Sequence, residues 1–95
     1  MKYGLNEETY NSIKEIAKKN SKYKFKIFGS RAKGTYKSNS DIDIAIFEDV
    51  TQEDKFKIKN EIDELNIIYK IDLVFIEENI KKELLESIKR EGVEF

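Results

Sequence analysis

Apolar and polar residues follow three patterns that predict β-strands. Residues 23–28 and 41–46 alternate between apolar and polar side chains, and residues 70–76 are almost continuously apolar. In a strand, successive side chains point to opposite faces. The isoleucines of the second segment should therefore face the core, and Asp41 and Asp43 should share the other face.

Between and around these strands, apolar residues recur with helical spacing. Asn6 is suited to cap a first helix and Thr51 a third one, because their side chains can accept hydrogen bonds from free amides. A short second helix over residues 30–35 should stop at Gly34, and a last helix should be capped by Asn79 and end near Gly92. The apolar positions expected to face the core are Tyr10, Ile13, Ile16, Ala17, Ile58, Ile62, Leu65, Ile80, Leu84, Leu85 and Ile88.

The order helix, strand, short helix, strand, helix, strand, helix predicts an α/β (α+β) fold. We expect a small mixed sheet of three to four strands with helices packed on one face. The long strand–helix–strand connections favour some parallel pairing, whereas the strand order stays open. Since no repeat, linker or low-complexity segment is visible, residues 1–95 are expected to form a single domain.

The composition, 39% apolar and 39% charged, suits one core with a heavily solvated surface. The longest apolar run is four residues (73–76), too short for a transmembrane helix. The first residues lack the apolar stretch of a signal peptide. We therefore expect a cytoplasmic protein without membrane contact.

The chain contains no Cys and no His. Disulfides, thiolate or imidazole metal ligands, and catalytic triads built on His or Cys are thereby excluded. A metal would have to be held by oxygen ligands, which favours magnesium or manganese over zinc.

Positive charge is concentrated in one part of the sequence, although the net charge is only −1. Residues 16–40 contain eight Lys or Arg and no acidic residue, and residues 41–95 contain eight basic and sixteen acidic residues. Such a basic segment can attract an anionic ligand. It can equally be an ordinary solvated surface.

Asp41 and Asp43 are the first candidates for chemistry. On a strand their Cα atoms would lie about 6.6–7 Å apart on one face, so that both carboxylates could bind one metal ion or bridge two. An Asp-x-Asp pair on a strand can also be plain polar surface.

Asp72 is the third candidate, because it interrupts an apolar strand where an unpaired buried carboxylate would be costly. If this strand lies beside that of Asp41 and Asp43, three carboxylates meet. Each like-charged pair at about 5 Å then costs about 3 kcal/mol at an effective dielectric near 20. Two magnesium ions would reverse that repulsion, and such sites promote phosphoryl or nucleotidyl transfer. Alternatively, Asp72 sits at a strand end in water or pairs with a Lys.

Gly29 and Ser30 follow a predicted strand and begin a helical segment. A glycine allows a ligand to approach the backbone, and the following amides and the serine hydroxyl can bind phosphate oxygens. A simple turn is the alternative. Arg31, Lys33 and Lys37 could contact a triphosphate, or be solvated.

The segment from Gly29 to Asp43 resembles the minimal nucleotidyltransferases (MNT) of the DNA polymerase β superfamily. The resemblance rests on Gly-Ser-x-Ala-x-Gly, on Ser40 before the Asp41-Ile42-Asp43 string, on Asp72 and on the order of elements. It implies a polymerase-β-like nucleotidyltransferase fold. It also implies that Gly29 and Ser30 bind the nucleotide's phosphates, with Arg31 and Ser40 as further nucleotide-binding candidates.

The same resemblance implies a catalytic role for the three aspartates. Asp41 and Asp43 would ligate two Mg²⁺ ions, for which Mn²⁺ could substitute. Asp72 would ligate the catalytic ion and help to deprotonate the attacking hydroxyl. The substrate would be ATP.

Short members of this family are commonly antitoxins of HEPN/MNT modules, so the resemblance also implies a partner. The leading hypothesis is a protein adenylyltransferase that moves AMP from ATP to a tyrosine of a cognate HEPN ribonuclease toxin. One alternative is an antitoxin that masks its toxin by binding alone, with a vestigial site. Another is nucleotide transfer to RNA ends. The basic segment mildly favours it, whereas the near-neutral net charge and the few stacking aromatics disfavour it. The preferred nucleotide, the acceptor hydroxyl and any homo-oligomer stay open.

Overall fold

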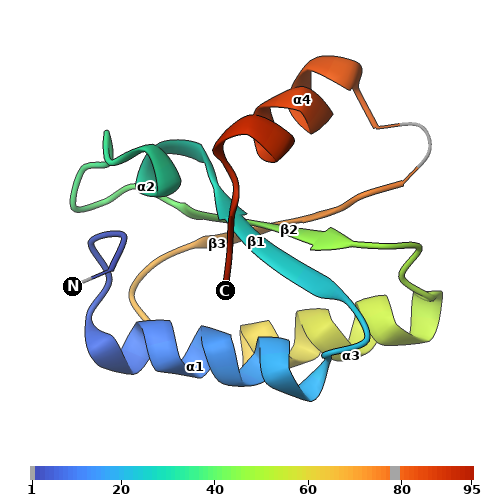
Figure 1. The fold of residues 1–95 in the computed structure, drawn as a ribbon. Coiled ribbons are helices and arrows are strands. Elements are labelled where there is room, and N and C mark those ends of the chain that lie inside the picture. Colours follow the sequence, from blue (N-terminus) through green and yellow to red (C-terminus); the bar gives the residue numbers. More distant parts are fainter. Residues whose placement is uncertain (1, 78–79) are drawn as a thin grey trace.

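The computed structural model describes residues 2–77 and 80–95 of the chain (Figure 1). Its elements, in chain order, are α1 (Glu7–Lys19), β1 (Lys24–Phe28), α2 (Gly29–Lys33), β2 (Ile42–Phe47), α3 (Gln52–Asp63), β3 (Ile71–Phe75), α4 (Lys82–Glu91) and β4 (Val93–Glu94).

Local sequence signals place the helix starts. The Asn6 side chain accepts a 2.8 Å hydrogen bond from the Thr9 amide at the start of α1, and Thr51 Oγ1 accepts one of 3.1 Å from the Asp54 amide at the start of α3. Both predicted caps are confirmed. Asn79, the expected cap of the last helix, lies outside the described residues, and α4 begins at Lys82.

The four strands form one mixed sheet in the order β3-β2-β1-β4. β1 pairs antiparallel with β2 and with β4, whereas β2 pairs parallel with β3 through the α3 connection. The expected three- to four-stranded sheet and its partly parallel pairing are confirmed. The fourth strand, β4, has only two residues, and the sequence pattern did not reveal it.

Helices cover both faces of the sheet, which corrects the expectation that they pack on one face (Figure 1). α1 and α3 lie over the face that carries Ile42, Ile44 and Ile46, and these three isoleucines are fully buried. On the opposite face, α4 places Ile88 against Ala45, and both are also fully buried. The physical reason is that β2 is apolar on both sides after its first two residues, so that one layer of helices could not shield it from water.

The strand register brings three distant segments to one end of the sheet. Phe28, the last residue of β1, is the register partner of Asp43 near the start of β2, and Asp43 is the partner of Asp72 near the start of β3. The turn that begins at Gly29 therefore leaves the sheet beside both aspartates.

In the part of the chain that the structure describes, every helix is too short or too polar to cross a membrane.

Candidate functional site

The three predicted aspartates lie close together at one end of the sheet. Asp43 and Asp72 are register partners on the parallel strands β2 and β3, which lie about 4.8 Å apart as neighbouring strands do. Asp41 precedes Asp43 by two residues, immediately before β2. All three are partly exposed. The sheet therefore brings together residues that are about thirty positions apart in the sequence.

The pKa of Asp43 reflects its closeness to the other two aspartates. The pKa of Asp43 is raised above its ordinary value of 3.8, first by burial, then by the negative charge of Asp72 and then by that of Asp41. Each of these effects penalises the ionised carboxylate. Asp43 is thus the centre of the cluster, and its charge is the one that a cation would relieve most.

Asp72 was expected either to join the other aspartates or to pair with a lysine near a strand end, and it does both. Its side chain is 41% exposed, and its Oδ1 lies 3.6 Å from Nζ of Lys70, which is itself largely solvated. Such exposed pairs contribute little to stability. Asp72 is therefore a lysine-paired residue near a strand end and also a neighbour of Asp43.

The donor chemistry of this cluster fits a divalent cation with oxygen ligands. Within residues 2–77 and 80–95, no group of three acidic side chains is close enough to hold a metal ion as placed. The carboxylates would have to converge further to bind one. Their partial exposure permits that movement, and their mutual repulsion would favour a hard cation such as Mg²⁺.

Gly29 is required by the geometry next to Asp43. Its φ of +74° lies in the left-handed region, and a Cβ at this position would overlap the Asp43 carboxylate. Ser30 follows at the start of α2 and is half-buried. The predicted phosphate-binding turn therefore lies directly against Asp43, one of the predicted metal ligands.

Arg31 and Ser40, also predicted to bind the nucleotide, are placed differently. Arg31 is only 1% exposed, and its guanidinium donates to backbone carbonyls, including that of Ser40 at 2.9 Å. The Ser40 hydroxyl accepts a 2.8 Å hydrogen bond from the Lys37 amide and so closes a turn. These contacts favour a role in shaping the loop over direct contact with a nucleotide.

The basic segment does not form one surface around the site. Lys18 and Lys19 end α1, and Lys24 begins β1, so these lysines lie at the end of the strand opposite Gly29. Nearer the site, Lys33 of α2 is engaged in an ion pair with Glu91 of α4. Only part of the positive charge could therefore act on a ligand at the aspartates.

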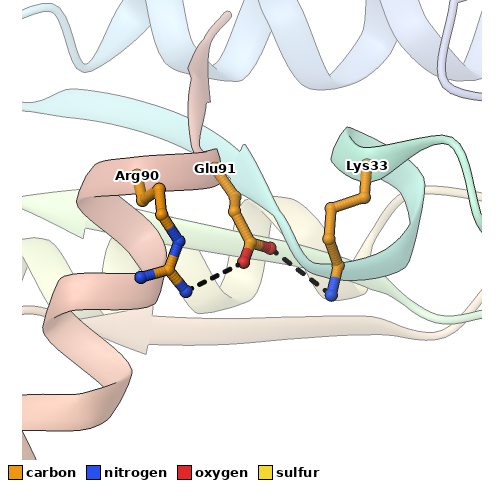
Figure 2. A network of polar contacts seen from close by, with 3 residues as sticks. All are labelled: Lys33, Arg90 and Glu91. Carbon is orange, nitrogen blue, oxygen red and sulfur yellow. Dashed lines mark hydrogen bonds and ion pairs between the residues drawn. The ribbon is translucent and has the colours of Figure 1, made fainter.

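Glu91 links α2 to α4, as Figure 2 shows. It lies 3.4 Å from Lys33 Nζ and 3.3 Å from Arg90 Nη2. Glu91 Oε2 is buried and makes no hydrogen bond to the residues that the structure describes, so Lys33 is its charge partner. This pair joins α2, which begins at Gly29, to the last helix, α4.

The sequence does not reveal the supporting roles of Glu91 and Tyr69 or the burial of Arg31. The centre of the Tyr69 ring lies 4.7 Å from Cζ of the Arg31 guanidinium. One signal was available: the chain has only two arginines, Arg31 and Arg90, among eighteen basic residues. An arginine in a chain that otherwise uses lysine suggests a need for the planar guanidinium.

Replacing Asp43 by Asn should raise the melting temperature at neutral pH. The folded-state pKa of Asp43 is raised, so the stability that this group contributes is present below pH 3.8 and is lost as the pH rises through the folded-state value. The gain from Asp43→Asn should therefore vanish below pH 3.8. Magnesium should stabilise the wild type more than the variant. Thermal unfolding at several pH values, with and without magnesium, measures both effects.

Glu94→Gln is the matched control, because it removes one negative charge from an exposed position on β4. Its effect should stay within about 0.5 kcal/mol. An equal gain in both variants, or none in Asp43→Asn, would show that the aspartates do not repel one another.

Comparisons with known proteins identify a family and two similar solved structures. The family model described as "Polymerase beta, Nucleotidyltransferase" matches residues 11–95. Among solved structures, a chain described as "Crystal structure of the toxin-antitoxin with AMP-PNP" is similar, with a TM-score of 0.67 and 26% identity over 95% of this chain and 72% of that chain. A chain from a mutant of the toxin–antitoxin MntA-HpeT has a TM-score of 0.62 and 22% identity over 96% of this chain and 72% of that chain. No curated protein matches.

The matched range covers nearly the whole chain, and Gly29, Ser30 and the three aspartates lie within it. The fold class predicted from the sequence is confirmed. The chain belongs to the polymerase beta nucleotidyltransferase family.

Proposed function

We propose that this protein is a magnesium-dependent adenylyltransferase that acts as an antitoxin by transferring AMP from ATP to a tyrosine of a HEPN-family toxin. The observation that carries the proposal is the contact between the Gly29 turn and the Asp43 carboxylate, with Asp41 and Asp72 beside it. A phosphate-binding turn and three carboxylates in one place are what nucleotidyl transfer requires.

The reaction would be an in-line displacement at the α-phosphorus of ATP. The tyrosine oxygen would form the new bond to phosphorus, the bond to the bridging oxygen would break, and pyrophosphate would leave. Bound magnesium would supply positive charge that neutralises the triphosphate and the developing charge of the transition state.

The chain's own residues would position the substrates. The backbone at Gly29 and Ser30 would hold the phosphates, and Asp41, Asp43 and Asp72 would hold two ions. Asp72 is also suited to accept the proton of the attacking hydroxyl, because its carboxylate is exposed and therefore accessible. Most of the rate increase would come from positioning and charge neutralisation.

The partner and the nucleotide are supported by similarity. The solved chain that is 26% identical comes from a toxin–antitoxin crystallised with AMP-PNP, an analogue of ATP. The second similar chain comes from a toxin–antitoxin in which a tyrosine is replaced by alanine. The first description agrees with an antitoxin that uses ATP. The HEPN class of the toxin is what the sequence resemblance implies.

Transfer to RNA is less well supported by the structure than by the sequence. The basic segment that favoured RNA is divided between the two ends of β1, and one of its lysines is paired with Glu91. A continuous basic groove would be needed to hold a single strand.

The proposal predicts that the aspartates are needed to neutralise the toxin. The protein, its neighbouring gene product and magnesium should be incubated with ATP labelled on the α-phosphate. Label should appear on a toxin tyrosine, and the double variant Asp41→Asn plus Asp43→Asn should abolish both the label and the rescue of growth. If the double variant still rescues, the protein acts by masking its toxin. If the wild type rescues growth but no label appears on the toxin, adenylyl transfer is refuted.

The contact at Gly29 gives a second test of the site. Gly29→Ala should reduce transfer at least about 100-fold, since a misplacement of about 1 Å can have that effect and the new Cβ would displace Asp43. Gly34→Ala is the matched control: its φ is +82°, and no atom lies within 4 Å of the new Cβ. Both variants should lose about 1–2 kcal/mol from left-handed strain. Equal transfer by the two variants, normalised to folded protein, would contradict the predicted contact.

A further inference from the structure

Arg31 is a buried cation that forms no ion pair with a carboxylate of the described residues. It is 1% exposed, and its guanidinium donates to the carbonyls of Tyr3 at 2.9 Å and of Ser40 at 2.9 and 3.1 Å. A longer contact of 3.5 Å reaches the carbonyl of Ser38. A buried charge is costly unless such groups replace its hydration.

Two aromatic rings complete the environment of this guanidinium. The ring of Tyr69 lies 4.7 Å and that of Tyr36 5.2 Å from the central carbon, within the range of cation–π attraction. Carbonyl dipoles and ring faces together favour the planar, multiply donating arginine over lysine.

The partners of Arg31 come from the segments that carry the site. Ser40 immediately precedes Asp41, and Tyr69 lies three residues before Asp72. The carbonyl of Lys70, next to Tyr69, accepts a 2.8 Å hydrogen bond from the amide of Ile42, which lies between Asp41 and Asp43. Arg31 itself follows Ser30. It thus connects the phosphate-binding turn, the Asp41 loop and the start of β3.

The N-terminal turn also contacts Arg31 and one of its aromatic neighbours. Tyr3 supplies a carbonyl to Arg31, and Gly4, with φ of +70°, lies so close to the Tyr36 ring that a Cβ there would overlap it. Leu5 anchors the turn in the core with no exposed surface. The turn therefore contributes to the environment of Arg31 through the Tyr3 carbonyl and through its packing against the Tyr36 ring.

We propose that Arg31 is a positioning residue: by binding the Ser40 carbonyl and stacking on Tyr69, it fixes Asp41 relative to Ser30 and Asp72. This inference rests on the proposed nucleotidyl transfer, and it reassigns Arg31 from nucleotide ligand to internal support. A lysine at this position would keep the charge, but a single ammonium cannot bind the two carbonyls with the same planar geometry and stack on both rings.

Arg31→Lys tests the proposal in the full chain, with Arg90→Lys as the matched control at the only other arginine, which is exposed. Hydrogen exchange is the readout that does not depend on activity. The Ser40 amide, bonded to the Lys37 carbonyl at 3.0 Å, should exchange at least about tenfold faster in Arg31→Lys. The Asn20 amide at the end of α1 should be unchanged.

Steady-state kinetics supply the second readout. Arg31→Lys should lower kcat about 10- to 100-fold, the range found when groups that orient metal ligands are removed, with KM for ATP nearly unchanged. Arg90→Lys should change neither constant. A raised KM with unchanged kcat and unchanged Ser40 exchange would show that Arg31 binds the nucleotide directly. Equal acceleration of all amides with unchanged kcat would show a general structural role. Either result overturns the proposal.

Two further outcomes can be distinguished from a failure of the proposal: a wild type without transfer activity, and a variant that does not fold. If the wild type transfers no nucleotide, the proposed function fails, and the positioning of the loop is decided by Ser40 exchange alone. If Arg31→Lys does not fold, Tyr69→Leu replaces it, because leucine keeps an apolar side chain and removes the ring face. Tyr69→Leu should accelerate exchange at Ser40 in the same local way, and a failure to do so would refute the proposal.

Discussion

Repulsion among Asp41, Asp43 and Asp72 is the constraint on which the rest of the structure depends. Burial, and then the negative charges of Asp72 and Asp41, raise the pKa of Asp43. The same negative charges oppose the approach of β2 to β3. The sheet forms despite this repulsion because its central strand β2 is buried on both faces. The apolar core thus offsets the cost of the cluster and leaves the carboxylates available for a cation.

The packing on both faces also fixes the strand register. Ile42, Ile44 and Ile46 are held under α1 and α3, and Ala45 is held under α4. A shift of β2 by one residue would turn all of these side chains to the wrong face and would carry Asp43 away from Asp72. The same burial that stabilises the fold therefore sets the spacing of the aspartates, and Gly29 permits the turn to approach them.

Local features of this protein were predictable from its sequence, and long-range features were less so. The caps Asn6 and Thr51 and the alternation around Asp43 depend on neighbouring residues, so the pattern revealed them. The placement of α4 on the opposite face was not predicted. In residues 41–46 that face carries Asp43 and only one apolar side chain, the small Ala45, so the sequence pattern indicates a polar face. The two-residue β4 is too short to leave a pattern.

The site was predicted where residue type carries the chemistry and missed where burial decides the role. Asp41, Asp43 and Asp72 were identified as carboxylates that would need a cation, and the β2–β3 pairing then placed Asp43 beside Asp72. Arg31 was read as a candidate nucleotide ligand because its motif suggests one. Its burial depends on carbonyls from Tyr3 and Ser40, whose approach only the folded chain creates.

The central claim is that the three carboxylates and the Gly29 turn form one metal-dependent nucleotide site. Its most direct test is a crystal structure of the protein soaked with manganese and a non-hydrolysable ATP analogue, measured for anomalous scattering. We predict manganese peaks bounded by Asp41, Asp43 and Asp72, with phosphate density against the backbone of Gly29 and Ser30. A nucleotide bound elsewhere, with no manganese at these aspartates, would contradict the claim.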